Sequence, residues 1–436
     1  MKTLCALSLL TAASLIADNS SELFLDDEEF LAENAKKSTQ NQNNSQQPRT
    51  SYSDSSCCKP CCVPKPKKCI NCECYTPAFY ESNGCDNGLF ITADFLYWYG
   101  KETNLAYASK EMTVPQSIGS TGSIIVQEKT KHLGAKWAPG FRVGIGMETD
   151  CDGWDYYLNY TWYHSKKTDE TSVASNFGTS ASPFNPLVGQ EALLSPWINI
   201  NIANGSTATF FTPYLFNRIS AEWKLTLNDL VFELGRKFWL SKCFVMRPYA
   251  ALRGAWVRRD FEVMSIRDNT PAAGALARFK SDFLDRFWGV GMELGLQPEW
   301  YFSERFAVIS NFDAALLWGR FRNRKKEDDV TQAITMPVDY HRTSSNIFSK
   351  MQAIFDLMVG FRWDETWACN RYRTALDIGW EQHFWLNFSN MIRQSNTFLV
   401  SGVFGAGTFQ SGSQSFTENQ GDLIFGGLTV RFRFDF

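Results

Sequence analysis

Alternation of apolar with polar or small residues, repeated from Gly88 to Phe436, is the feature that most constrains the fold. In the first segment the odd-numbered residues from Leu89 to Tyr99 are mostly large and apolar, whereas Thr92 and Asp94 share the other face. A period of two residues predicts β-strands whose two faces meet different surroundings. The pattern recurs in ten segments, which comprise residues 89–99, 141–149, 154–162, 218–234, 244–256, 287–302, 306–321, 351–361, 376–388 and 428–436.

The connections between these segments alternate between short and long. Short turns fall at residues 150–153, 241–243, 303–305 and 363–371, and long loops at 100–136, 165–217, 260–284, 322–350 and 389–421. Outer-membrane barrels have short periplasmic turns and long outer loops, an asymmetry that a soluble β-sandwich does not require. We therefore predict an all-β, antiparallel, up-and-down transmembrane β-barrel of about 10–12 strands, with both termini in the periplasm.

Two details refine this prediction. A change of phase near Asn228 and Asp229 predicts a β-bulge within the segment 218–234. Strands hidden in the long loops would widen the barrel, and residues 123–129, 197–203 and 396–404 are the candidates.

Composition agrees with a barrel and excludes other classes. The net charge of -3 argues against a nucleic-acid partner. After the first seventeen residues no apolar run approaches the roughly 18 residues that a transmembrane helix needs, although aromatic residues make up 15% of the chain. Tryptophans near strand ends predict an aromatic belt at the lipid interface; they are Trp98, Trp137, Trp162, Trp239, Trp256, Trp300, Trp318 and Trp385.

The N-terminal part divides into three segments. Residues 1–17 have the charged start and apolar core of a signal peptide, with cleavage after Ala17 or, alternatively, after Ala13. Residues 18–56 form an acidic and then Gln/Asn/Ser-rich linker, which we expect to be disordered. Residues 57–87 are Cys-rich, and residues 88–436 are the predicted barrel.

The Cys-rich segment permits two interpretations. It contains Cys57, Cys58, Cys61, Cys62, Cys69, Cys72, Cys74 and Cys85. Two Cys-x-x-Cys pairs resemble zinc knuckles, but they lie closer together than is usual, so we predict no metal. An exported segment favours disulfides, and adjacent cysteines favour cross-links to other envelope proteins or to a second copy of the chain. Cys151, Cys243 and Cys369, at predicted periplasmic turns, are further candidates.

The last strand carries a short signal of its own. Phe432, Phe434 and Phe436 alternate with polar residues, and the chain ends on an aromatic. Such a strand looks like the signal that the outer-membrane assembly machinery recognises.

Four segments together resemble a known family. They are GLFITADFLYWYG (88–100), RPYAALRGAW (247–256), GWEQHFWLN (379–387) and RFRFDF (431–436). Over residues 88–436 the chain resembles the Legionella-type major outer membrane protein family, MOMP-like pore-forming proteins whose Cys-bearing members occur in environmental chlamydia-like bacteria. The resemblance implies a pore-forming barrel of the Gram-negative outer membrane, and the Cys-rich segment departs from the simplest members.

The leading functional hypothesis is a porin for passive diffusion of small hydrophilic solutes or ions, in contact with outer-membrane lipid and without cofactors. The residues predicted to line the pore are Asp94, Arg142, Glu148, Asp155, Glu222, Lys224, Arg247, Arg253, Glu293, Asp313, Arg362, Asp377, Glu381, Arg431 and Arg433. Alternatively these charges pair and plug the interior, because small barrels are often filled by side chains. The protein would then be a cross-linked structural barrel, or a surface adhesin without an open pore.

An enzyme is the third class, and we predict that the protein is not one. His383, near Asp377 and Glu381 on one strand face, is the constellation that favours it. The four histidines show no Ser-His-Asp arrangement and no metal-binding spacing, so there are no predicted catalytic residues.

Overall fold

The computed structural model describes residues 88–118, 121–149, 154–174, 191–197, 215–241, 243–267, 277–329, 341–367, 372–400 and 410–436. The predicted signal peptide, linker and Cys-rich segment lie outside these ranges, as do the predicted turn 150–153 and the cysteines Cys151 and Cys369. Within the described ranges there is no helix long and apolar enough to cross a membrane.

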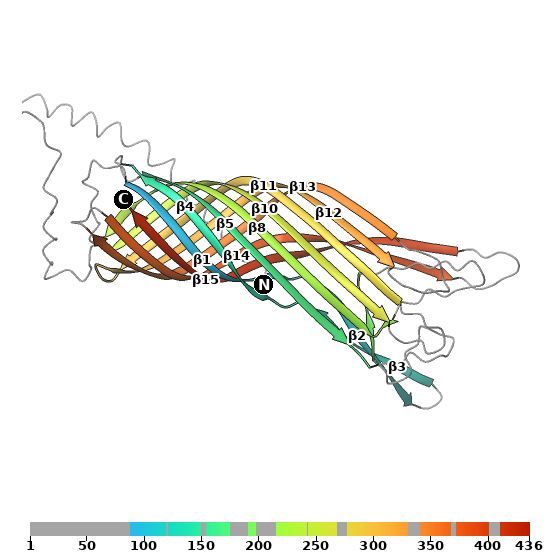
Figure 1. Ribbon diagram of the computed structural model, residues 1–436. Coiled ribbons are helices and arrows are strands. Elements are labelled where there is room, and N and C mark those ends of the chain that lie inside the picture. The colour runs from blue at the N-terminus through green and yellow to red at the C-terminus, as the bar shows by residue number, and fades with distance from the viewer. Residues whose placement is uncertain are drawn as a thin grey trace, which may run out of the picture. The chain divides into compact units, whose positions relative to one another are not determined.

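Ten antiparallel strands in the described part of the chain close into a barrel (Figure 1). In their order around the barrel they are β1 (Gly88–Glu102), β4 (Lys136–Glu148), β5 (Trp154–Ser172), β8 (Arg218–Arg236), β10 (Phe244–Arg267), β11 (Ala277–Tyr301), β12 (Phe306–Asp329), β13 (His341–Trp367), β14 (Tyr372–Val400) and β15 (Gln410–Asp435). The first and last strands pair, with Phe90 opposite Asp435, and so close the sheet. The short β9 (Phe238–Ser241) adds to β10.

A second sheet lies at the end of the barrel away from the C-terminus (Figure 1). Its order is β3 (Thr121–His132), β2 (Ala106–Ile118), β6 (Glu191–Leu194) and β7 (Leu215–Phe216). The predicted strand 123–129 therefore exists but does not widen the barrel. Of the other two candidates, residues 396–400 extend β14, and Trp197 lies in a turn.

The barrel strands are longer than their apolar alternation predicts. Seven of the ten predicted segments lie within the barrel strands and the other three end one residue beyond them, but β10 continues to Arg267, and β12 continues to Asp329. Much of the predicted long loops 100–136, 260–284, 322–350 and 389–421 is thus strand. At the other end the described turn 303–305 is short, as predicted, with the Ser303 N–H donating to the Phe306 carbonyl at 3.2 Å.

The outer face has an apolar band of the kind that a barrel in lipid needs. Large side chains such as Phe95, Phe141, Leu252, Met292 and Phe361 are each between 44% and 65% exposed on this face. Their neighbours in sequence point inward and are buried, which confirms the two environments that the alternation predicted.

Farther along the strands toward the second sheet, the polarity of the two faces is exchanged. In β8 the buried, inward residues are polar at Asp229 and Glu233 but apolar at Trp223, Leu225 and Leu227. The register of β8 with β5 and β10 runs through this point without a break, so the predicted bulge at Asn228 and Asp229 is wrong. The phase change marks the place where the inward face changes from charged to apolar.

A register shift does occur in β14, between Trp385 and Ser389. Asn387 lies within it with φ 51°, a left-handed conformation in which asparagine is among the better tolerated residues. Its N–H donates to Asp422 Oδ1 at 2.8 Å, and the Lys350 ammonium donates to its carbonyl.

Candidate functional site

The barrel interior holds a layer of buried, ion-paired side chains centred on Arg253. Its guanidinium donates to Asp229 Oδ2 at 2.7 Å, to Glu293 Oε2 at 2.8 Å and to Asp356 Oδ2 at 2.7 Å. The arginine and its three partners come from β8, β10, β11 and β13, so one side chain ties four strands together. All four side chains are at most 9% exposed.

A second group continues the layer across the barrel. Arg142 donates to Asp94 Oδ2 at 3.2 Å and to both oxygens of Glu381 at 3.0 Å. Arg431 shares Asp94 at 3.0 Å. His383 links the two groups, because its Nδ1 lies 2.8 Å from Asp356 and its Nε2 lies 3.3 Å from Glu381.

Further pairs fill the interior toward the end of the barrel that is away from the second sheet. Arg247 binds Asp155, and its Nη1 donates to Glu233 at 2.8 Å. Arg362 donates to Asp377 at 2.7 Å and to Glu299 at 2.6 Å. In a third set Arg433 donates to Glu148 at 2.7 Å, and Lys237 donates to the same carboxylate.

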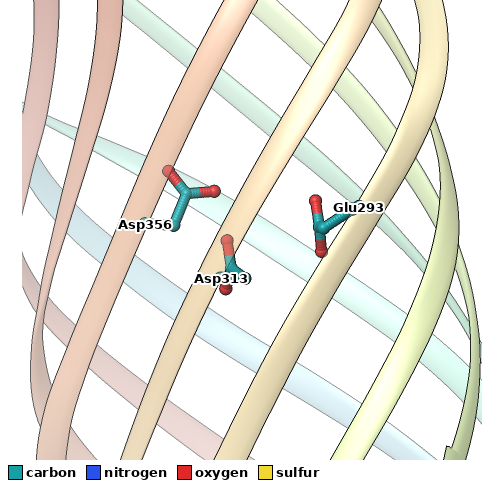
Figure 2. Close-up of side chains that lie close together, drawn as sticks. All are labelled: Glu293, Asp313 and Asp356. Carbon is teal, nitrogen blue, oxygen red and sulfur yellow. The ribbon is translucent and has the colours of Figure 1, made fainter. Parts of the chain in front are cut away.

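Glu293, Asp313 and Asp356 form a cluster of three carboxylates on β11, β12 and β13, shown in Figure 2. Their oxygens lie within 4.8 Å of one another, and these are the residues in the described chain that could hold a cation. Arg253 already donates to both Glu293 and Asp356. Asp313 accepts hydrogen bonds from Tyr249 and Asn311 on Oδ2, while its buried Oδ1 has no hydrogen-bond partner. The guanidinium thus takes the position between two carboxylates that a metal ion would need.

A cavity of about 110 Å³ remains in this layer. Its lining includes Arg142, Arg253, Asp313, Glu381 and His383. By volume it has room for several water molecules, not for a peptide or sugar.

Beyond the charged layer, toward the second sheet, the interior is apolar and aromatic. We call this the apolar plug, and it includes Trp98, Tyr163, Leu227, Phe287, Phe321, Trp385, Phe388 and Phe425, all at most 4% exposed. The rings pack edge to face, for example Trp385 on Phe388 at 5.4 Å between centroids. Trp197 closes the plug near the second sheet, packing on Phe261 and Phe283 and donating from Nε1 to the Ala106 carbonyl at 2.5 Å.

The structure places thirteen of the fifteen predicted pore-lining residues inside the barrel, and the pairs above bring them together. Glu222 and Lys224 are exceptions. They lie on the outer face of β8, in phase with exposed Phe232, and pair with each other, and Glu222 also pairs with Lys166. Their inward placement was wrong because the predicted bulge would have reversed the phase of this part of the strand.

The structure corrects two further predictions. Trp98 and Trp385 belong to the apolar plug and not to the lipid interface, although Trp137, Trp256, Trp300 and Trp318 are 40% to 59% exposed on the outer face. Cys243 is 6% exposed and packs with Val245 and Tyr301, so it is not available for cross-linking in this conformation.

Sequence reasoning missed several members of the interior. Asp229, Glu233, Glu299, Asp356, Asp364 and Arg373 were not among the predicted residues, nor were Glu102, Arg259 and Asp285, which form a buried ion triad within the apolar plug. Alternation could have found Asp229 and Glu233, which keep the phase of β8. His383 was singled out correctly, but its partners are Asp356 and Glu381, whereas Asp377 pairs with Arg362.

Three solved structures to which the chain is similar share less than a tenth of its residues. The outer membrane protease OmpT from Escherichia coli is 9% identical, with a TM-score of 0.36, over 81% of this chain and 97% of that one. The toluene transporter TodX from P. putida is 9% identical, with a TM-score of 0.22, over 84% and 93%. A FadL homologue from Pseudomonas aeruginosa is 8% identical, with a TM-score of 0.20, over 81% and 90%.

No curated protein matches the chain. The model of the family described as Legionella pneumophila major outer membrane protein precursor matches residues 84–436, which is most of the chain and includes the whole barrel. The chain therefore belongs to the Legionella major outer membrane protein family and is an outer-membrane β-barrel.

Proposed function

We propose that this protein is a structural outer-membrane barrel whose interior is closed to diffusing solutes. The observation that carries the proposal is the apolar plug, which lies in series with the charged layer along the barrel. A hydrated ion that crosses the barrel would have to displace the side chains of both the charged layer and the apolar plug.

The charged layer by itself would allow two interpretations. Paired charges can line a wet channel, and ten strands enclose an interior that side chains can fill, because interior width grows with strand number. Here most partners are in direct contact, and the remaining cavity measures about 110 Å³. This favours a plugged interior over the passive porin that the family resemblance implies.

The apolar plug is our reason for preferring a closed interior to a water-filled channel. Trp385 and Phe425 are fully buried, and Trp98 is 1% exposed. Water gains little from wetting such a surface, and a dry apolar constriction blocks ions by excluding their hydration shells. The charged triad within the plug, Glu102, Arg259 and Asp285, is already engaged in its own ion pairs.

The ends of the barrel would then carry the function. We place both termini in the periplasm, as is usual when short turns lie on that side, so that the long strands and the second sheet project from the cell. The Cys-rich segment would lie in the periplasm and cross-link the barrel to envelope proteins or to a second copy. The projecting end would form the surface contacts of an adhesin.

We also propose no catalytic role for His383. It is held between Asp356 and Glu381 and packs against Trp98 with 4.6 Å between ring centroids. The cavity beside it is too small for a macromolecular substrate. A hydrolytic activity abolished by His383→Ala would contradict this.

The test is conductance in a planar bilayer under reducing conditions, with the full mature chain refolded and its barrel verified by circular dichroism. We expect the wild type to insert without discrete openings. The variant W98A/W385A/F425A, which empties the plug, should conduct if it folds, whereas Leu252→Ala on the outer face should stay silent. Reproducible openings of the wild type would overturn the proposal and favour the porin.

A further inference from the structure

The outer face of the barrel carries a row of exposed arginines across β10, β11 and β12. Arg258 lies directly opposite Arg286, and Arg286 lies directly opposite Arg322. Arg320 and Arg324 stand on the same face of β12, two residues to either side of Arg322. We call Arg258, Arg286, Arg320, Arg322 and Arg324 the arginine row.

The arginine row lies where the apolar band ends. Trp256 and Trp288 are cross-strand neighbours, each two residues from a member of the row, and Trp318 precedes Arg320 by two. All three tryptophans are 46% to 59% exposed. Tryptophan at this position marks the boundary between hydrocarbon and headgroups, so the arginines reach the headgroup level.

Most of the charge in the row is not neutralised by the protein. Arg258 pairs with Asp260 at 3.2 Å, but the other four make no side-chain ion pair or hydrogen bond to any residue that the structure describes. Nearby acids are engaged elsewhere, Asp282 with Lys280 and Asp328 with His341. Like charges directly opposite each other destabilise a sheet unless a counter-charge is bound.

The neighbouring strands β8 and β5 carry no comparable row among their described residues. Two residues after Trp162, the next outward residue of β5 is His164, which contacts the neutral Thr226 of β8. Lys166 and Lys224 lie farther along and share Glu222. The arginines without a protein counter-charge are therefore concentrated on β11 and β12, which favours a localised ligand over a general attraction to lipid.

We propose that the arginine row binds the phosphates of a phosphorylated glycolipid in the outer leaflet. Strands are spaced by about 4.8 Å, so the row spans roughly 10 Å across three strands and can hold more than one phosphate. Guanidinium groups bind phosphate oxygens in a bidentate manner. The adjacent Val290, Met292 and Leu316, exposed below the row, would contact the acyl chains. The inference rests on the orientation proposed above, in which this end of the barrel faces outward.

The test uses the full mature chain, folded in neutral detergent micelles, and measures binding by native mass spectrometry. The probes are bisphosphorylated lipid A, the same lipid stripped of its phosphates, phosphatidylglycerol and inorganic phosphate. The test variant is R286Q/R322Q, and the matched control is K101Q/K166Q, which removes the same charge from exposed outward positions on β1 and β5. All four substituted residues lie on the outer face of the barrel, so both variants should fold.

We expect bisphosphorylated lipid A to bind the wild type and the control equally. Each lost charged hydrogen bond should weaken binding roughly tenfold, so R286Q/R322Q should lose roughly 100-fold. Equal loss in the control, or tight binding of the dephosphorylated lipid, would overturn the proposal. So would equal affinity for phosphatidylglycerol, which would indicate recognition of any anionic lipid, or competition by inorganic phosphate, which would indicate a site for the free anion.

A failure of the lipid-binding proposal can be distinguished from a failure of the proposed closed barrel. Conductance depends on the apolar plug and is measured without lipid A, whereas lipid binding depends on the outer face. A conducting barrel that binds the phosphorylated lipid would retain this inference, and a silent barrel that ignores it would refute only this one.

Discussion

Arg253→Met tests whether the charged layer holds the barrel together. The substitution keeps much of the side-chain volume but leaves Asp229, Glu293 and Asp356 without the cation that all three contact. Three charged partners at about 1.5–3 kcal/mol each give an upper range of about 4.5–9 kcal/mol. Water entering the adjacent cavity and proton uptake would reduce this, and buried pairs that lose one partner typically cost about 3–5 kcal/mol. We expect a loss in that range.

The assay is urea unfolding of the barrel in phosphatidylcholine vesicles, followed by the fluorescence of its tryptophans. Lys101→Met, at an exposed position of β1, is the control and should change the free energy of unfolding by less than about 0.5 kcal/mol. The compensated variant R253M/D229N/E293Q should recover much of the loss, because it removes the uncompensated carboxylates while Asp356 keeps His383. If the compensated variant is as unstable as R253M, then packing and not charge explains the effect, and the reasoning fails.

Four further outcomes can be checked. Asp313→Asn should raise the urea midpoint, because it removes a charge beside two other carboxylates; a lower midpoint would mean that the charge is needed. Trp197→Ala should lower the free energy of unfolding by about 3–5 kcal/mol, and an unchanged value would show that the residue packs less tightly than in this structure. Phe436→Ala should reduce the heat-modifiable, membrane-inserted fraction in cells, and full insertion would refute its role as an assembly signal. The cysteines at 57–85 should give high-mass species on non-reducing gels, and a purely monomeric band would exclude cross-linking.

Local alternation explains why so much of the fold could be predicted. A strand with lipid on one side and an enclosed interior on the other shows its phase within a few residues, as Phe95 and Asp94 do in β1. The ten strands, their order and most inward residues follow from this rule. The same rule failed where the environment changed along one strand. From Asp229 toward the second sheet, the outward side chains of β8 become polar and the inward ones apolar. Glu222 and Lys224 were therefore placed on the wrong face.

Partners across the barrel could not be predicted, for a different reason. Arg253 and Asp356 meet because the closed sheet curves, so that side chains of β10 and β13, which are separated by β11 and β12, converge in the interior; nothing near either residue in sequence specifies that distance. The apolar plug escaped notice likewise, because Trp98 and Trp385 near strand ends look the same in sequence whether they point to lipid or inward. Barrel diameter and tilt decide that choice, and both depend on all ten strands together.

The seam between β1 and β15 has a consequence for the order of events in biogenesis. Phe90 pairs with Asp435, so the first barrel strand has no partner on one side until β15 has been made and delivered. Contacts this distant in sequence form slowly, and an unpaired strand edge invites association with other chains. A truncated or stalled chain would therefore retain two long edges and be a substrate for periplasmic chaperones and proteases, so the seam can act as a quality checkpoint that only complete chains pass.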